Sequence, residues 1–167
     1  DPRLRFSYNF YGAPALTLEE FSKFRQGLII GASLHISAPL GQYDSDKLVN
    51  NGSNRWAIKP ELGISKAWGP FTLELQPGVT FYSDNRDFPG FPGQKTREQD
   101  PIYSVQGHLV YNWRPGIWMA LDATWYKGGR TTVDGVRGDD LQRNTRVGAT
   151  LVLPVSRKHS IKLYAST

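Results

Sequence analysis

The chain has 167 residues and no cysteine, which excludes disulfide scaffolds and thiolate metal sites. Its 20 Lys and Arg against 15 Asp and Glu give a formal charge of +5, spread along the chain rather than gathered in a basic run, which argues against nucleic-acid binding. Mean hydropathy is −0.45. No apolar stretch approaches the ~18 residues of a membrane helix, which excludes an α-helical membrane protein. A membrane β-barrel is not excluded, because its strands alternate apolar and polar residues and their mean hydropathy is low.

Apolar and polar residues alternate with period two in eight segments, which predicts eight β-strands. In chain order the segments are 4–10, 28–38, 55–65, 71–82, 103–113, 117–126, 145–153 and 161–164. Short turns are expected at 67–70, 114–116 and 154–159, and long polar connections at 39–54, 83–98 and 128–142. Short and long connections that take turns are typical of an antiparallel barrel with one short-turn end. The fold class is therefore all-β.

The connection at 12–26 is long, although strand parity assigns it to the short-turn end. Thr17 and Glu20 have the spacing of a capping box and precede Phe21 and Phe24. We predict a short helix there; an irregular loop is the alternative.

The apolar face of the strands carries large aromatic side chains at both ends. The pairs are Trp56 and Trp68, Phe71 and Phe81, and Tyr103 and Trp113. Ten tilted strand residues rise about 25 Å, which matches the lipid-facing band of a membrane barrel. A soluble barrel or sandwich would instead turn this face inward. We expect the apolar face to meet lipid.

The opposite face is polar and is expected to line the lumen. The lumen-lining candidates are His35, Arg55, Lys59, Glu61, Glu74, Gln76, His108, Asp122, Arg146 and Lys162. Five glycines are assigned to the same face, namely Gly31, Gly63, Gly78, Gly107 and Gly148. Pro60 and Pro77 each remove a ladder donor, so local bulges are expected at both. Inward apolar residues, such as Val110, Trp118 and Val152, suit a small amphiphilic or aromatic permeant.

The turn at 114–116 predicts a register for its hairpin. If Trp113 lies opposite Ile117, then His108 lies across from Asp122 on the polar face. Gln106 would then face Thr124, and Ser104 would face Tyr126.

Two stretches carry a specific resemblance to a known family. They are Ser37-Ala38-Pro39-Leu40-Gly41-Gln42-Tyr43-Asp44 and Asn54-Arg55-Trp56-Ala57-Ile58-Lys59-Pro60-Glu61-Leu62-Gly63. Further matches are 97–101, His108 with Leu109, Tyr126 with Gly128 and Gly129, and 143–148. Over nearly its whole length the chain resembles a Gram-negative outer-membrane family named for the meta-pathway of phenol degradation. The resemblance implies an outer-membrane β-barrel of about twelve strands that passes small hydrophobic or aromatic molecules.

Since only eight strands are visible, residues 1–167 are expected to form a single barrel domain that is incomplete at one or both ends. The expected function is a channel for passive uptake of small hydrophobic or aromatic molecules; the alternative is a plugged, non-conducting structural or binding barrel. The expected partners are the bilayer, lipopolysaccharide and the permeant, with no nucleic acid, and the barrel is expected to be a monomer.

No enzyme, cofactor or metal site is expected. Ser104, His108 and Asp122 could assemble a hydrolase triad, but no nucleophile motif surrounds the serine. The three histidines lack metal-ligand spacing. Four loop carboxylates could bind calcium, and three loop arginines could touch anionic headgroups, although solvated charge is the simpler reading of both sets. They are Asp84, Asp87, Asp139 and Asp140, and Arg130, Arg137 and Arg143.

Overall fold

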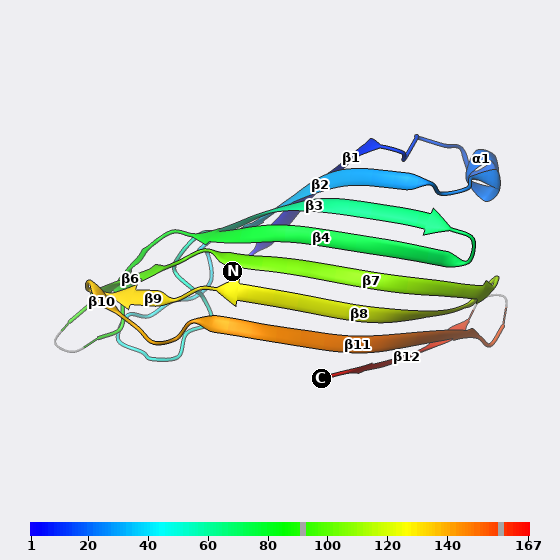
Figure 1. Ribbon diagram of the computed structural model, residues 1–167. Helices are drawn as coiled ribbons and strands as arrows, with labels where there is room; N and C mark the ends of the chain where they lie inside the picture. The colour runs from blue at the N-terminus through cyan, green and yellow to red at the C-terminus, as the bar shows by residue number, and fades with distance from the viewer. Residues whose placement is uncertain (91–92, 157–158) are drawn as a thin grey trace.

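A computed structural model covers residues 1–167, and the structure describes residues 1–90, 93–156 and 159–167. Eight long antiparallel strands lie side by side in one sheet (Figure 1). They are β1 (Arg3–Tyr11), β2 (Leu28–Ser37), β3 (Ala57–Trp68), β4 (Phe71–Tyr82), β7 (Ile102–Arg114), β8 (Ile117–Gly128), β11 (Gln142–Pro154) and β12 (Ser160–Ser166). Each of the eight predicted strands is present, and β1 and β12 form the two edges of a partial barrel.

A second, smaller sheet occupies the long-loop end of the molecule (Figure 1). Its strands are β5 (Asn85–Phe88), β6 (Lys95–Gln99), β9 (Thr131–Val133) and β10 (Val136–Arg137), in the order β10-β9-β6-β5. These strands lie in the long polar connections expected at 83–98 and 128–142, where no strand was predicted, and β6 extends one residue beyond the first of them. Strands of two to five residues are too short for alternation to be visible, and their pairing joins two different loops. Residues 91–92 of the predicted connection at 83–98 lie outside the described residues.

The predicted short helix is α1 (Leu18–Lys23), at the short-turn end. Thr17 and Glu20 form the expected capping box, with the Thr17 amide donating to Glu20 Oε2 at 2.8 Å. Those hydrogen bonds hold the pKa of Glu20 below its usual value. No helix in the described part of the chain is long and apolar enough to cross a membrane.

The exposure of the two sheet faces establishes which one is concave. Side chains on the concave side of a curved sheet crowd one another, whereas those on the convex side stand apart. Leu121 and Val105, on the apolar face, are 54% and 41% exposed, while Ala120 and Val152, on the opposite face, are 4% and 9% exposed. The girdle aromatics Trp56, Trp68 and Phe81 are also exposed. The apolar face is therefore outward, as in a membrane barrel.

One glycine faces the opposite side from the expected one. Gly107 pairs with Leu75 and Ala123, and a Cβ added to it would lie 3.3 Å from Leu75 Cδ2, on the lipid side. The reason is parity: position 107 shares the face of Val105 and Leu109.

The two prolines interrupt backbone pairing without shifting its register. Ile58 pairs with Phe81, Glu61 with Gly78 and Ile64 with Leu75, so the register between β3 and β4 is constant and the expected bulges are absent from this described pair. Pro60 and Pro77 fall in the intervals between those pairs. Each still pairs with its other neighbour, Leu34 and Val105 respectively, so both interruptions lie between β3 and β4.

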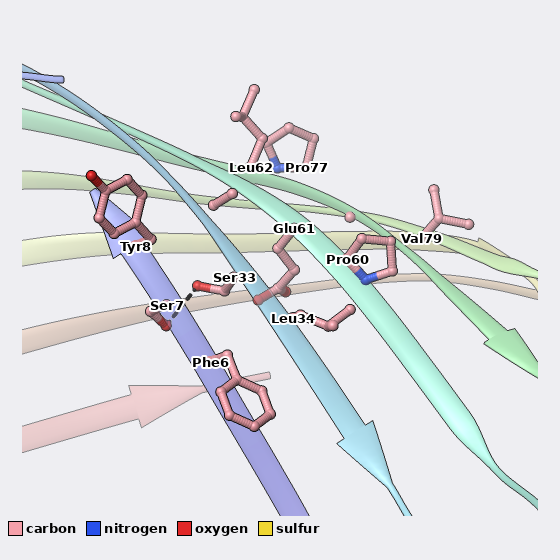
Figure 2. Close-up of a pocket in the computed structure, with 12 residues that line it drawn as sticks. Phe6, Ser7, Tyr8, Ser33, Leu34, Pro60, Glu61, Leu62, Pro77 and Val79 are labelled. Carbon is pink, nitrogen blue, oxygen red and sulfur yellow. Dashed lines mark hydrogen bonds between the residues drawn. The ribbon is translucent and has the colours of Figure 1, made fainter. Parts of the chain in front are cut away.

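An apolar groove of about 710 Å³ follows these interruptions on the outward face. Pro60, Leu62, Pro77 and Val79 lie along it, together with Leu34 of β2 (Figure 2). Phe6 and Tyr8 of the edge strand β1 complete the groove.

The hairpin of β7 and β8 has the predicted register over most of its length. His108 pairs with Asp122, Gln106 with Thr124, and Ser104 with Tyr126. Near the turn the prediction is wrong: Arg114, not Trp113, pairs with Ile117, across the two-residue turn Pro115–Gly116. A bulge between Asn112 and Arg114 offsets the shorter turn, so the pairs farther along are unaffected. Residues 157–158 of the predicted turn at 154–159 lie outside the described residues.

Candidate functional site

The ten lumen-lining candidates all lie on the concave face of the sheet or at its mouth. They come from seven barrel strands and the residue two positions before β3. The strand assignments are His35 on β2, Lys59 and Glu61 on β3, Glu74 and Gln76 on β4, His108 on β7, Asp122 on β8, Arg146 on β11 and Lys162 on β12, with Arg55 ahead of β3. The structure gathers most of them into two clusters.

The first cluster surrounds Glu61 in the proline-containing region. Glu61 Oε1 lies 2.6 Å from Lys59 Nζ, and its Oε2 lies 2.7 Å from His35 Nε2. The Glu61 side chain is only 11% exposed. Gly78, directly opposite on β4, makes room for it, because an added Cβ would lie 2.9 Å from Glu61 Cγ. Because Gly78 has no side chain, the Glu61 carboxylate can lie along the wall between Lys59 and His35.

The second cluster surrounds Asp122. Asp122 Oδ1 is hydrogen-bonded to His108 Nδ1, and Oδ2 accepts from Thr150 Oγ1 at 3.3 Å. The second ring nitrogen of His108 lies 2.8 Å from Gln106 Nε2. Arg146 and Lys162 border the same hollow of about 630 Å³, and within the described residues neither has a carboxylate partner.

The three residues considered for a hydrolase triad are not joined to one another. Ser104 Oγ donates to the carbonyl of Gly78 at 3.3 Å, and the nitrogens of His108 contact Gln106 and Asp122. In a Ser-His-Asp triad the serine hydroxyl lies within hydrogen-bond reach of a histidine nitrogen. Ser104, His108 and Asp122 therefore do not form a triad in this structure.

Two of the four loop carboxylates considered for calcium, Asp140 and Asp87, accept hydrogen bonds within the loops. Asp140 accepts from the Thr131 amide at 2.9 Å and from Thr131 Oγ1 at 2.7 Å, and these bonds hold its pKa below the usual value. Asp87 accepts from Asn54 Nδ2 at 3.2 Å. Across residues 1–90, 93–156 and 159–167, no three His, Asp or Glu side chains are grouped as metal ligands.

Asn85 is the centre of a hydrogen-bonded hub, with Tyr43 and Asn54, at the long-loop end of the barrel. Asn85 is 3% exposed; its Nδ2 donates to Tyr43 Oη at 2.8 Å, and its Oδ1 accepts from Asn54 Nδ2 at 2.9 Å. Tyr43 Oη in turn donates to the carbonyl of Asp87 at 3.1 Å. The loop at 39–54 is thereby tied to β5.

Several lumen-facing residues were missed by the sequence analysis. Arg3 and Arg5 share the parity of Ser7 on β1, and Arg5 donates to Ser33 Oγ at 3.3 Å. Strand parity was enough to find both. Tyr82, over which the Arg55 guanidinium lies at 4.3 Å, is also at the inward mouth, but that pairing spans two strands and needed the fold.

The model of one protein family, described as "Putative MetA-pathway of phenol degradation", matches residues 1–167. The chain belongs to this family. This confirms the resemblance carried by the segments at 37–44 and 54–63.

The chain is also similar to the crystal structure of an outer-membrane channel from Pseudomonas putida F1, with a TM-score of 0.78 and 26% sequence identity. The similarity covers 98% of this chain and 57% of the channel, so the chain spans little more than half the length of that structure. No curated protein matches the sequence. Family and fold together place the protein in the outer membrane of a Gram-negative bacterium, as an antiparallel β-barrel of which this chain is a part.

Proposed function

We propose that the full-length barrel is a passive channel for small hydrophobic or aromatic molecules. The similarity to an outer-membrane channel supports the transport class. The observation that carries the choice of permeant is the inward apolar surface near the short-turn end. Among the described residues, the buried hydrophobic side chains are Ala120 and Val152, and both face inward.

This surface forms one continuous patch on three strands. Val110 pairs with Ala120 and Trp118 pairs with Val152, and Ala120 and Trp118 lie two positions apart on the same face of β8. The Glu61 cluster and the pair of His108 and Asp122 lie farther toward the mouth, whereas Lys162 pairs directly with Val152 at the border of the patch. A molecule crossing the lumen therefore meets mostly polar groups first and an apolar wall bordered by one lysine afterwards, an arrangement that suits a permeant with a hydrophobic body.

Flux of a neutral aromatic compound through the full-length protein in liposomes tests the proposal. We expect toluene to enter faster than glucose, and the isosteric change Val152→Thr to slow toluene. Val147→Thr is the matched control, because Val147 lies on the same strand, faces outward and is 50% exposed. Equal slowing by both variants, or faster entry of glucose, would contradict the proposed permeant.

The second candidate is a plugged barrel with a structural or binding role. It is favoured by the hydrogen bonds of Asn85, which join the loop at 39–54 to β5 at the long-loop end of the barrel. Conductance in planar bilayers separates the two: an open channel gives stepwise current, whereas a plugged barrel gives none. Absence of current together with absence of toluene flux would support the second candidate.

A further inference from the structure

A hollow of about 640 Å³ lies on the inward side at the long-loop mouth, apart from the apolar patch. Arg3, His35, Arg55 and Lys59 line it, together with the carboxylate of Asp1 and the ring of Tyr82. Its volume is in the range of small-molecule sites, and its lining mixes charge with apolar surface.

The carboxylates of Asp1 and Glu61, next to this hollow, form hydrogen bonds and ion pairs with groups other than Arg3 and Arg55. Asp1 Oδ1 accepts from the Gly41 amide at 2.8 Å, and Asp1 Oδ2 accepts from the amide and hydroxyl of Ser53 at 2.8 and 2.7 Å. Glu61, beneath the hollow, is taken by Lys59 and His35. Within the described residues, Arg3 and Arg55 therefore have no carboxylate partner.

Arg55 is the more constrained of the two arginines. Its guanidinium lies over the Tyr82 ring at 4.3 Å and is half-buried, and its Nη1 is enclosed without a hydrogen-bond acceptor among the described residues. Burial, and after it the charge of Arg97, lower the pKa of the Arg55 guanidinium. Arg55 is thus a half-buried cation beside the Tyr82 ring and the positive charge of Arg97. A buried charge is costly without a counter-charge, and none of these neighbours supplies one.

We propose that this hollow is a binding subsite for the carboxylate of a small organic acid, with Arg55 and Arg3 as its cationic partners. Arginine presents several N–H donors in a fork that matches a carboxylate, and Tyr82 supplies an apolar surface beside it. The subsite deepens the proposed function, since it adds acids with an apolar body to the molecules that the mouth accepts. Its occupation does not depend on passage through the lumen.

Equilibrium binding to the full-length protein in detergent micelles tests the subsite. The probes are benzoate and benzamide, which share a ring and a shape but differ in charge. We expect benzoate to bind at least about tenfold more tightly than benzamide, the ratio that one charge-assisted hydrogen bond gives. Equal affinities would overturn the proposal.

Variants locate the site. Arg55→Gln should weaken benzoate binding at least about tenfold and leave benzamide binding unchanged. Arg55→Lys keeps the charge but not the fork of donors, so it should retain part of the benzoate affinity. Arg86→Gln removes the same charge from an exposed position on β5, outside the hollow, and should bind benzoate like the wild type. Should Arg55→Gln fail to fold, Arg3→Gln on the edge strand makes the same test. Equal losses in the Arg55 or Arg3 variant and in Arg86→Gln would refute the assignment.

Inorganic phosphate distinguishes the chemical class of the ligand. If phosphate displaces benzoate at equal concentration, the hollow is a general anion site and the carboxylate assignment is wrong; weak displacement supports it. Because binding is measured without flux, a protein that binds benzoate but passes no toluene refutes only the channel, and the reverse result refutes only the subsite.

Discussion

Two hairpins of the same sheet place a carboxylate on the lumen wall in different ways. In β7–β8 the pairing is continuous around His108, and Asp122 takes its partner directly across the ladder. In β3–β4 the pairing is interrupted at Pro60 and Pro77. There Glu61 leans over Gly78 and takes its partners from its own strand and from β2.

The difference shows how backbone and side-chain pairing are linked in a barrel wall. Where each cross-strand position carries a side chain, opposite charges can pair within one hairpin. Where a glycine stands opposite, the longer acid lies across it and joins three strands together. We therefore expect the stability of the β3–β4 hairpin to depend on the absence of a side chain at Gly78. The stability of the β7–β8 hairpin should depend on the pair of His108 and Asp122.

The largest effect should come from reversing the outward face that both hairpins share. Leu75 of β4 pairs with Gly107 of β7 and is exposed on the apolar face, well inside the girdle aromatics Phe71 and Phe81. Leu75→Arg should lower the free energy of unfolding by about 2–4 kcal/mol, the cost of a cation near the bilayer midplane. Urea unfolding from lipid vesicles measures it, with Glu74→Arg on the inward face as control. If Glu74→Arg lowers the free energy of unfolding by as much, the assignment of the faces is wrong.

A smaller effect should follow from filling the space beneath Glu61. Gly78→Ala places a Cβ 2.9 Å from Glu61 Cγ and 3.1 Å from the Pro60 carbonyl oxygen, so we expect a loss of about 1–3 kcal/mol. Gly107→Ala is the matched change in the other hairpin. Its Cβ would meet only Leu75 Cδ2 at 3.3 Å and the Glu74 carbonyl oxygen at 3.7 Å. The same unfolding assay should rank Gly78→Ala below Gly107→Ala in stability, and the opposite order would contradict the role of Gly78.

The charged pair of the β7–β8 hairpin should contribute less. Asp122→Asn keeps the shape and the contact with Thr150 but replaces a charge-assisted hydrogen bond to His108 by a neutral one. We expect a loss of about 0.5–1.5 kcal/mol. Histidine ring resonances recorded by NMR at one pH should show His108 changed and the exposed His159 unaffected. Unchanged resonances at both histidines would mean that the pair does not form.

The smallest change in stability should come from restoring a ladder donor. Pro77→Val returns an N–H to the β3–β4 interface but also loosens the unfolded chain, so the net change should stay under about 1 kcal/mol. The sensitive readout is amide hydrogen exchange, which should slow in β3–β4 and stay constant in β7–β8. Unaltered exchange in β3–β4 would show that the prolines do not limit its pairing.

The sequence alone determined the eight long strands, the face that meets lipid and most of the β7–β8 register. The period-two alternation that predicted them extends over four to twelve residues in each segment, so the signal accumulates within one stretch of sequence. The signal for the helix α1 was also local, because Thr17 and Glu20 form the capping box within its first turn. Family membership followed from contiguous segments.

Only the tertiary structure decided what the polar residues do with one another. The link from Glu61 to His35 crosses strands, and the hub at Asn85 joins residues 31 and 42 positions apart. The small sheet at the mouth joins loops whose strands are too short to show a period. That Arg3 and Arg55 have no carboxylate partner in the described part of the chain became visible only when Asp1 and Glu61 were found bonded to other groups. Such pairing depends on which strands become neighbours, and local alternation carries no information about that choice.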